Sequence, residues 1–210
     1  MKAFIFDLDG VIVSTDSLHY RAWKSLADSE GIYFDEEINH RLRGVSRMES
    51  LEIILERATR NYTQEEKVAM AERKNGIYRE LLQVLTPEDR LEGVTETLAA
   101  LREKGYKLAI GSSSKNTPII LEKIGCSGYF DAISDGNNIK NSKPDPEVFL
   151  KAAEFLGAEP KDCFVVEDAE AGIAAAKAGG FTAIGIGAAA KDPATDYPIT
   201  TFKDLLNIAK

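Results

Sequence analysis

The chain has 210 residues, with 26 lysine and arginine against 34 aspartate and glutamate, so its formal net charge is −8 at pH 7. That balance argues against general nucleic-acid affinity, because phosphate backbones bind basic surfaces, and no apolar run approaches the roughly 18 residues of a membrane span. The first residues turn acidic too early for a signal peptide, and two cysteines cannot build a disulfide framework. We therefore expect a reduced, cytoplasmic, globular protein.

Short apolar runs alternate with helical patterns along most of the chain. The runs predict strands at residues 3–6, 107–110, 132–133, 164–166 and 183–186. The helical patterns between them cover residues 94–104, 118–124, 147–156 and 171–178. Such alternation is typical of βαβ units, so the sequence predicts an α/β fold with a Rossmann-like parallel sheet covered by helices on both faces.

One long stretch breaks this alternation. From about residue 16 to residue 85 the chain carries only helical signals, including two capping boxes, Ser46 with Glu49 and Thr63 with Glu66. An all-helical insert after the first strand of a parallel sheet predicts a cap domain, and Pro87 marks the return to the sheet. We expect a core domain of residues 1–14 and 87–210 and a helical cap domain of residues 15–86.

Acidic side chains follow two of the predicted strands. Asp7 and Asp9 end the first strand and are followed by Gly10, and Glu167 and Asp168 end the fourth. Ligands of open α/β sheets bind beyond the carboxyl ends of the strands, so these carboxylates are expected to face one pocket. Crowded carboxylates repel one another, and an all-oxygen site suits Mg²⁺. A solvated aspartate pair in a surface turn is the alternative for Asp7 and Asp9 taken alone.

Two further segments offer groups suited to phosphate. Residues 112–116 (Ser-Ser-Ser-Lys-Asn) follow the second strand and precede a helix, where hydroxyl groups and backbone N–H groups can cradle an anion. The alternative is a serine-rich turn with a helix cap. Lys143 lies in a later loop and matters only if that loop folds back onto Asp7.

These motifs together resemble a known superfamily. Residues 6–11 (Phe-Asp-Leu-Asp-Gly-Val), Ser112, Lys143 with Pro144 and Asp145, and Glu167 with Asp168 resemble, in order, the four motifs of the haloacid dehalogenase superfamily of phosphotransferases. The resemblance implies that Asp7 is a nucleophile that forms an aspartyl phosphate and that Asp9 is a general acid and base. It also implies that Lys143 neutralises charge, and that Ser112 and the N–H group of Ser113 hold the phosphoryl group. The implied Mg²⁺ ligands are Asp7, the carbonyl group of Asp9, Glu167 and Asp168.

The cap sequence narrows the resemblance to the β-phosphoglucomutase family. The matching segments are Thr15, residues 19–23, residues 42–47, residues 49–51, residues 73–75, residues 113–116 and residues 128–133. The resemblance implies a second phosphate site built from Arg47, Ser114, Lys115 and Asn116, with Gly44 and Val45 lining the sugar. It implies that Thr15 and His19 couple cap closure to Asp9, with Lys74 nearby. Two departures, Ser14 in place of Asp and Ala169 in place of Ser, remove no residue that the chemistry needs.

Three functions stay open at this stage. The first is an isomerase that interconverts β-glucose 1-phosphate and glucose 6-phosphate through a 1,6-bisphosphate. The second is a phosphatase or pyrophosphatase with the same core, and the third is a non-enzymatic sugar-phosphate sensor. The intact acidic residues argue against a sensor, and a second phosphate site argues against a simple phosphatase. We expect a monomer that binds a sugar phosphate and neither nucleic acid nor membrane.

Overall fold

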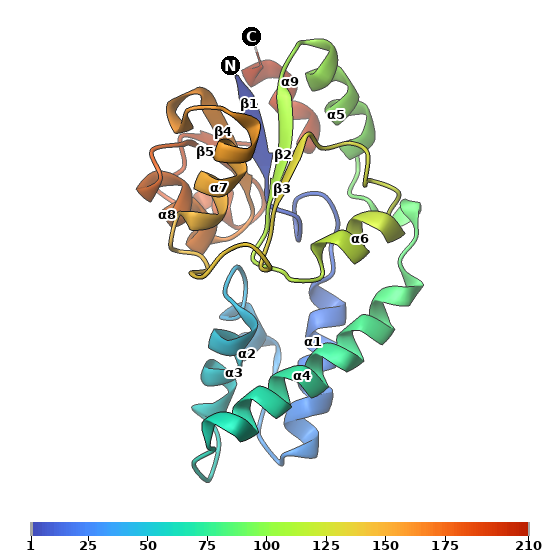
Figure 1. Cartoon of the computed structure of the whole chain (residues 1–210), viewed down its shortest axis with the longest axis vertical. Coiled ribbons are helices and arrows are strands. Elements are labelled where there is room, and N and C mark those ends of the chain that lie inside the picture. The colour runs from blue at the N-terminus through green and yellow to red at the C-terminus, as the bar shows by residue number, and fades with distance from the viewer. Residues whose placement is uncertain (1, 210) are drawn as a thin grey trace.

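A six-stranded parallel sheet lies at the centre of the larger part of the molecule (Figure 1). In the computed structural model, which describes residues 2–209, the strands are β1 (Ala3–Phe6), β2 (Lys107–Gly111), β3 (Ala132–Ser134), β4 (Cys163–Glu167), β5 (Thr182–Gly185) and β6 (Tyr197–Pro198). Their order is β3-β2-β1-β4-β5-β6, and every neighbouring pair is parallel. The predicted α/β fold is confirmed, and five strands lie within one residue of their predicted ends. The short, exposed β6 was not predicted, because its two residues form no apolar run.

Helices cover both faces of this sheet because alternate strand residues point to opposite sides. Phe4 and Phe6 of β1 pack with the helices α5 (Val94–Glu103), α6 (Thr117–Lys123) and α9 (Leu205–Ile208). Ala3 and Ile5 pack on the other face with α7 (Glu147–Leu156) and α8 (Glu170–Ala178). All four residues of β1 are fully buried, which explains why the strand reads as a continuous apolar run.

The segment between β1 and α5 forms a separate group of helices. It comprises α1 (Asp16–Ser29), α2 (Glu36–His40), α3 (Arg47–Leu55) and α4 (Gln64–Leu81), which lie below the sheet in Figure 1. They share an apolar cluster of their own, built around Trp23, Leu26, Phe34 and Leu51. Both predicted capping boxes are present, at the start of α3 and at the start of α4. The division of the chain into two domains at the expected residues stays a prediction.

The two connections between the helical segment and the sheet lie side by side. Val13 pairs in antiparallel fashion with Arg90, and the N–H group of Leu91 donates to the carbonyl of Ile12 at 2.9 Å. Short 3₁₀ helices occupy Leu82–Val84, Pro87–Asp89, Pro160–Asp162, Ala189–Lys191 and Phe202–Asp204. Within residues 2–209, every helix is too short or too polar to cross a lipid bilayer.

Candidate active site

A cavity of about 550 Å³ lies between the carboxyl ends of the strands and the helical segment. Every candidate residue identified in the sequence lines this cavity, some from the sheet part and some from the helical segment. They are Asp7, Asp9, Thr15, His19, Gly44, Val45, Arg47, Lys74, Ser112, Ser113, Ser114, Lys115, Asn116, Lys143, Glu167 and Asp168. The structure therefore brings all of them to one place. None of them lies on a separate surface.

Lys143 connects two of the strand ends. Its loop folds back onto the sheet, which is the condition that the sequence analysis set for a role of Lys143, and its Nζ donates to Oδ1 of Asp7 at 2.6 Å and also to Oε1 of Glu167. The Lys143 side chain is 1% exposed. Burial opposes its charge, but the attraction of Asp7 and Glu167 prevails and raises the pKa of Lys143 above its usual range. A permanent ammonium group is thus fixed beside the Asp7 carboxylate.

Three carboxylates converge at this point. Asp7, Glu167 and Asp168 each offer an oxygen atom, and these oxygens lie within 4.8 Å of one another. Burial, reinforced by repulsion from Asp7, raises the pKa of Glu167, and burial with repulsion from its neighbours raises that of Asp168. A divalent cation would relieve both effects, and hard oxygen ligands suit Mg²⁺. The residues present therefore fit the magnesium site that the sequence predicts.

Two glycines make room for these acids. At Gly10, which has φ of +81°, an added Cβ would lie 2.2 Å from Oδ2 of Asp168. At Gly172, in α8, an added Cβ would lie 1.9 Å from Cδ of Glu167, whose Oε2 accepts the N–H groups of Asp168 and Ala169 at 3.0 Å. Gly172 was missed by the sequence reasoning, although a glycine inside a helix just beyond an acidic strand end is a usable signal.

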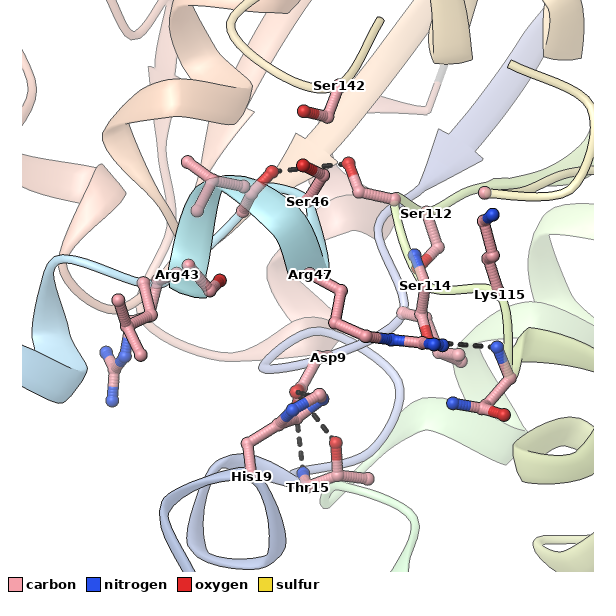
Figure 2. A pocket seen from close by; sticks show the side chains of 18 of the residues that line it. Asp9, Thr15, His19, Arg43, Ser46, Arg47, Ser112, Ser114, Lys115 and Ser142 are labelled. Carbon is pink, nitrogen blue, oxygen red and sulfur yellow. Dashed lines mark hydrogen bonds and ion pairs between the residues drawn. The ribbon is translucent and has the colours of Figure 1, made fainter. Parts of the chain in front are cut away.

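The Asp9 carboxylate is not part of the acidic cluster and instead faces the helical segment. It accepts the N–H group and the hydroxyl of Thr15, both at 2.7 Å (Figure 2). Nε2 of His19 lies 3.8 Å from Oδ2 of Asp9. Burial, together with repulsion from Asp7 and Asp16, outweighs the Thr15 hydrogen bonds and raises the pKa of Asp9 to about 6. Such a carboxyl group can exchange a proton near neutral pH.

A buried polar chain supports Thr15 and His19. The Tyr78 hydroxyl donates to Oγ1 of Thr15 at 2.9 Å, and its ring stacks on the His19 ring with centroids 4.0 Å apart. Nζ of Lys74 lies 2.9 Å from Nδ1 of His19 and 4.6 Å from the centre of the Trp23 ring. Burial, with repulsion from nearby cations, lowers the pKa of both His19 and Lys74. With Lys74 as donor, Nε2 of His19 carries the ring proton toward Asp9. Tyr78 was not identified from the sequence, although it follows Lys74 by one helical turn.

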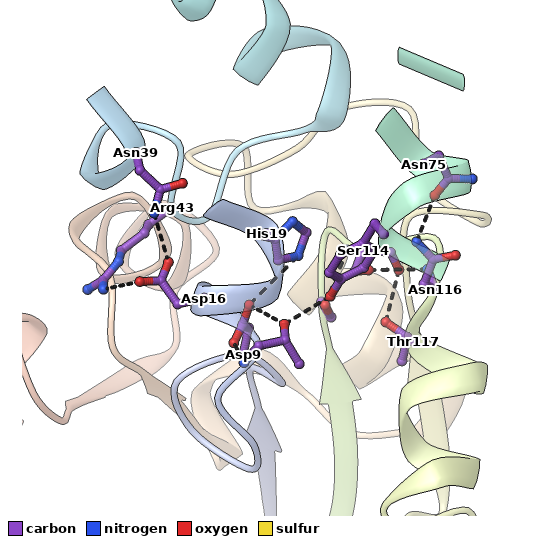
Figure 3. Close-up of polar contacts among 12 residues, drawn as sticks. Asp9, Asp16, His19, Asn39, Arg43, Asn75, Ser114, Asn116 and Thr117 are labelled. Carbon is purple, nitrogen blue, oxygen red and sulfur yellow. Dashed lines mark hydrogen bonds and ion pairs between the residues drawn. The ribbon is translucent and has the colours of Figure 1, made fainter. Parts of the chain in front are cut away.

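The helical segment contacts the loop after β2 at two points. The Ser113 hydroxyl donates to the carbonyl of Gly44 at 3.2 Å, and Nδ2 of Asn116 donates to Oδ1 of Asn75 at 3.0 Å (Figure 3). Arg47 begins α3 and extends toward Ser114 in Figure 2. The predicted phosphate-binding loop and the predicted phosphate-binding arginine therefore face each other across the cavity.

A third contact ties the start of α3 to the loop of Lys143. Oε2 of Glu49 accepts the N–H group of Ser46 at 2.9 Å and also accepts the hydroxyl of Ser142. Ser142 immediately precedes Lys143, and Ser46 immediately precedes Arg47. One carboxylate thus joins the backbone of Ser46 to the side chain of Ser142. No sequence pattern indicates the second contact, because Glu49 and Ser142 are 93 residues apart.

Comparison with known proteins places this cavity in a family. Residues 1–180 match the family model of the haloacid dehalogenase-like hydrolases. The chain belongs to this family. It is an enzyme of the haloacid dehalogenase type, as the four motifs around the cavity indicated. The resemblance stated from those motifs is thereby confirmed.

Several relatives within the family are similar over most of their length. The β-phosphoglucomutase of Bacillus subtilis is 47% identical over 189 residues, which cover 89% of this chain and 84% of the relative. A phosphorylated carbohydrates phosphatase of Thermotoga maritima is 33% identical, with coverage of 88% and 84%. The crystal structure of β-phosphoglucomutase from Clostridium difficile superposes with a TM-score of 0.93 at 40% identity, covering 98% of this chain and 93% of that one.

Proposed function

We propose that this haloacid dehalogenase-type enzyme is a β-phosphoglucomutase, which interconverts β-D-glucose 1-phosphate and D-glucose 6-phosphate. The observation that carries the proposal is the two-sided cavity, with Asp7 and Lys143 at the strand ends and Arg47 facing the 114–116 loop. A mutase that works through a bisphosphate needs places for two phosphate groups. The similarity to the two β-phosphoglucomutases of Bacillus subtilis and Clostridium difficile supports the same assignment.

The strand ends would carry out the phosphoryl transfer. Asp7 would attack the phosphoryl group and become an aspartyl phosphate, while Lys143 offsets the negative charge that the dianion brings. Ser112 and the N–H group of Ser113 would hold the transferring group. Asp7, Glu167, Asp168 and the carbonyl group of Asp9 would hold Mg²⁺, which when bound supplies further charge neutralisation.

Asp9 would move the proton of the sugar hydroxyl. Its carboxylate takes that proton as the phosphoryl group passes to the sugar, and its acid form returns a proton when the sugar oxygen leaves. The contacts with Thr15 and His19, and through His19 with Lys74, tie Asp9 to the helical segment. We infer that these residues bring Asp9 to its working position only when the helical segment lies against the sheet.

The opposite wall would hold the phosphate that is not reacting. Arg47 has the planar donor geometry that suits a phosphate group, and Ser114, Lys115 and Asn116 would complete this second site. Gly44 and Val45 would line the sugar between the two phosphates. After the first transfer the bisphosphate would reorient, so that the other phosphate reaches Asp7 and the second site accepts the opposite end of the molecule.

We also propose that residues 15–86 act as a cap domain over a core of residues 1–14 and 87–210. The helical segment would exclude water from the phosphorylated Asp7, because a mutase must retain its phosphoryl group until sugar arrives. A cytoplasmic location and a monomeric state accompany this proposal as predictions from composition and resemblance.

A phosphatase acting on a small phosphate ester is the second candidate. The 33% identity to the Thermotoga maritima phosphatase favours it, because the same strand-end residues serve both reactions. An assay of β-glucose 1-phosphate that measures glucose 6-phosphate and inorganic phosphate in parallel separates the two. A mutase forms glucose 6-phosphate in large excess over free phosphate. Release of phosphate as fast as isomerisation would refute the mutase and favour the phosphatase.

A further inference from the structure

One carboxylate on the cavity wall has no part in the proposed mechanism. Glu72 lies on α4, lines the cavity, and places Oε1 3.0 Å from Nη1 of Arg47. It therefore contacts the guanidinium group that would bind the non-reacting phosphate. A carboxylate and a phosphate carry charge of the same sign, so Glu72 and the substrate compete for one cation.

The other cationic side chains that the helical segment places on the cavity are engaged elsewhere. Arg43 pairs with Asp16 at 2.8 Å, as Figure 3 shows, and Lys74 contacts His19. Within residues 2–209, the charged partner of Arg47 is Glu72. Arg47, which shares the proposed second phosphate site with Lys115 of the loop after β2, is thus neutralised by an acidic side chain of its own helical segment.

The two members of this ion pair differ in their freedom to move. The Arg47 side chain is 20% exposed and sits at the capped start of α3, whereas the Glu72 side chain is 67% exposed. Glu72 can therefore swing into solvent while Arg47 stays in place. Ion pairs with an exposed partner are weak, so a phosphate dianion can displace Glu72 at a small cost.

We propose that Glu72 is an internal counter-anion of Arg47, displaced when phosphate enters the second site and restored when phosphate leaves. This inference rests on the proposed mutase function, because a bisphosphate that must reorient has to leave Arg47 in every catalytic cycle. Glu72 lowers the affinity of the second site for phosphate and stabilises the site while it is empty. It acts through its contact with the Arg47 guanidinium group and does not contact the reacting atoms.

The test compares two substitutions that change the net charge equally. Glu72→Gln removes the counter-anion, and Glu80→Gln, at an exposed position two turns further along α4, is the matched control. Binding of inorganic phosphate is measured by titration calorimetry. We expect Glu72→Gln to bind phosphate about 2- to 5-fold more tightly than the wild type, which corresponds to an exposed ion pair. Glu80→Gln should match the wild type, and Glu72→Ala should behave as Glu72→Gln does.

Arg47→Ala locates the effect, because inorganic phosphate can also bind beside Asp7. In an Arg47→Ala background, Glu72→Gln should no longer change phosphate affinity. In the assay with β-glucose 1-phosphate, Glu72→Gln should lower KM by the same 2- to 5-fold without raising kcat, a split that a merely structural role would not produce.

Two results would overturn the inference. One is phosphate affinity in Glu72→Gln equal to that in Glu80→Gln. The other is weaker binding in Glu72→Gln, which would make Glu72 a support that holds Arg47 in position for phosphate. Phosphate affinity is measured without turnover, so the binding test of Glu72 can fail or succeed independently of the activity assay that tests the proposed function. A wild-type enzyme without mutase activity would refute the function and leave the Glu72 measurement to be judged by itself.

Discussion

Replacing Gly172 by alanine should damage the site through a single methyl group. The new Cβ would lie 1.9 Å from Cδ of Glu167, and the separation must grow to the 3.4 Å of ordinary contact, a shift of about 1.5 Å. The Glu167 carboxylate would then leave Lys143 and the N–H groups that it accepts. A hydrogen bond to a charged group contributes about 1.5–3 kcal/mol, and alanine returns about 1 kcal/mol of helix propensity. For the loss of one such hydrogen bond, we expect the free energy of unfolding to fall by a net amount of about 0.5–2 kcal/mol.

The effect of Gly172→Ala on activity should be larger than its effect on stability. Displacement of a positioned group by about 1 Å can lower a rate about 100-fold, and the concentration of Mg²⁺ needed for half-maximal activity should rise. Gly76→Ala is the control, because Gly76 also lies inside a helix but an added Cβ meets nothing within 4 Å. Gly76→Ala should gain about 0.5–1 kcal/mol and keep its activity. Urea unfolding and steady-state assays would refute this reasoning if both variants gained stability and stayed active.

Three further predictions concern the roles of single side chains. Asp7→Asn should abolish both isomerisation and phosphate release, because an amide is a poor nucleophile; more than trace turnover would contradict its role. Arg47→Ala should lower isomerisation about 10- to 100-fold, given about 1.5–3 kcal/mol for a charge-assisted contact, while phosphorylation of Asp7 by acetyl phosphate persists; unchanged isomerisation would leave Arg47 without a role in binding. The third concerns pH. Because burial raises the pKa of Asp9 to about 6, its ionisation costs stability as pH rises from about 4 to about 6. With a chelator present, the free energy of unfolding of Asp9→Asn minus that of the wild type should therefore increase from about pH 4 to about pH 6 and stay constant above it. A difference that does not change with pH would exclude the raised pKa.

The sheet and most of the cavity could be predicted because they depend on local patterns. A strand buried on both faces, such as β1, reads as an unbroken apolar run, and a capping box such as that of Ser46 and Glu49 marks a helix start within four residues. The rule that ligands bind beyond the carboxyl ends of parallel strands then brings Asp7 and Glu167 together without knowledge of the side-chain positions. The family resemblance added Arg47 and the residues around it.

The contacts that no pattern predicts are those between distant parts of the chain. Glu72 is one of many acidic residues on an exposed helix face, and only the fold shows that it meets Arg47. Tyr78 reaches Thr15 across 63 residues, and Ser142 reaches Glu49 across 93. Each of these residue types has an ordinary explanation in its own helix or loop. Their partners depend on how the helical segment sits against the sheet, and that geometry follows from packing and not from local sequence.

The paired connections between sheet and helices bear on how such a chain can be rebuilt. Ile12 and Val13 run beside Arg90 and Leu91, joined by main-chain contacts, so the helical segment leaves the sheet and returns to it at one point. If the helical segment were removed, a short turn could join residue 13 to residue 90 without changing the order or direction of any strand. If residues 15–86 form a cap domain, as proposed, we expect this segment to be exchangeable as a unit. A different set of helices grafted between Val13 and Arg90 would meet the same side chains at the strand ends, and the choice of substrate would be expected to change while the sheet stays the same.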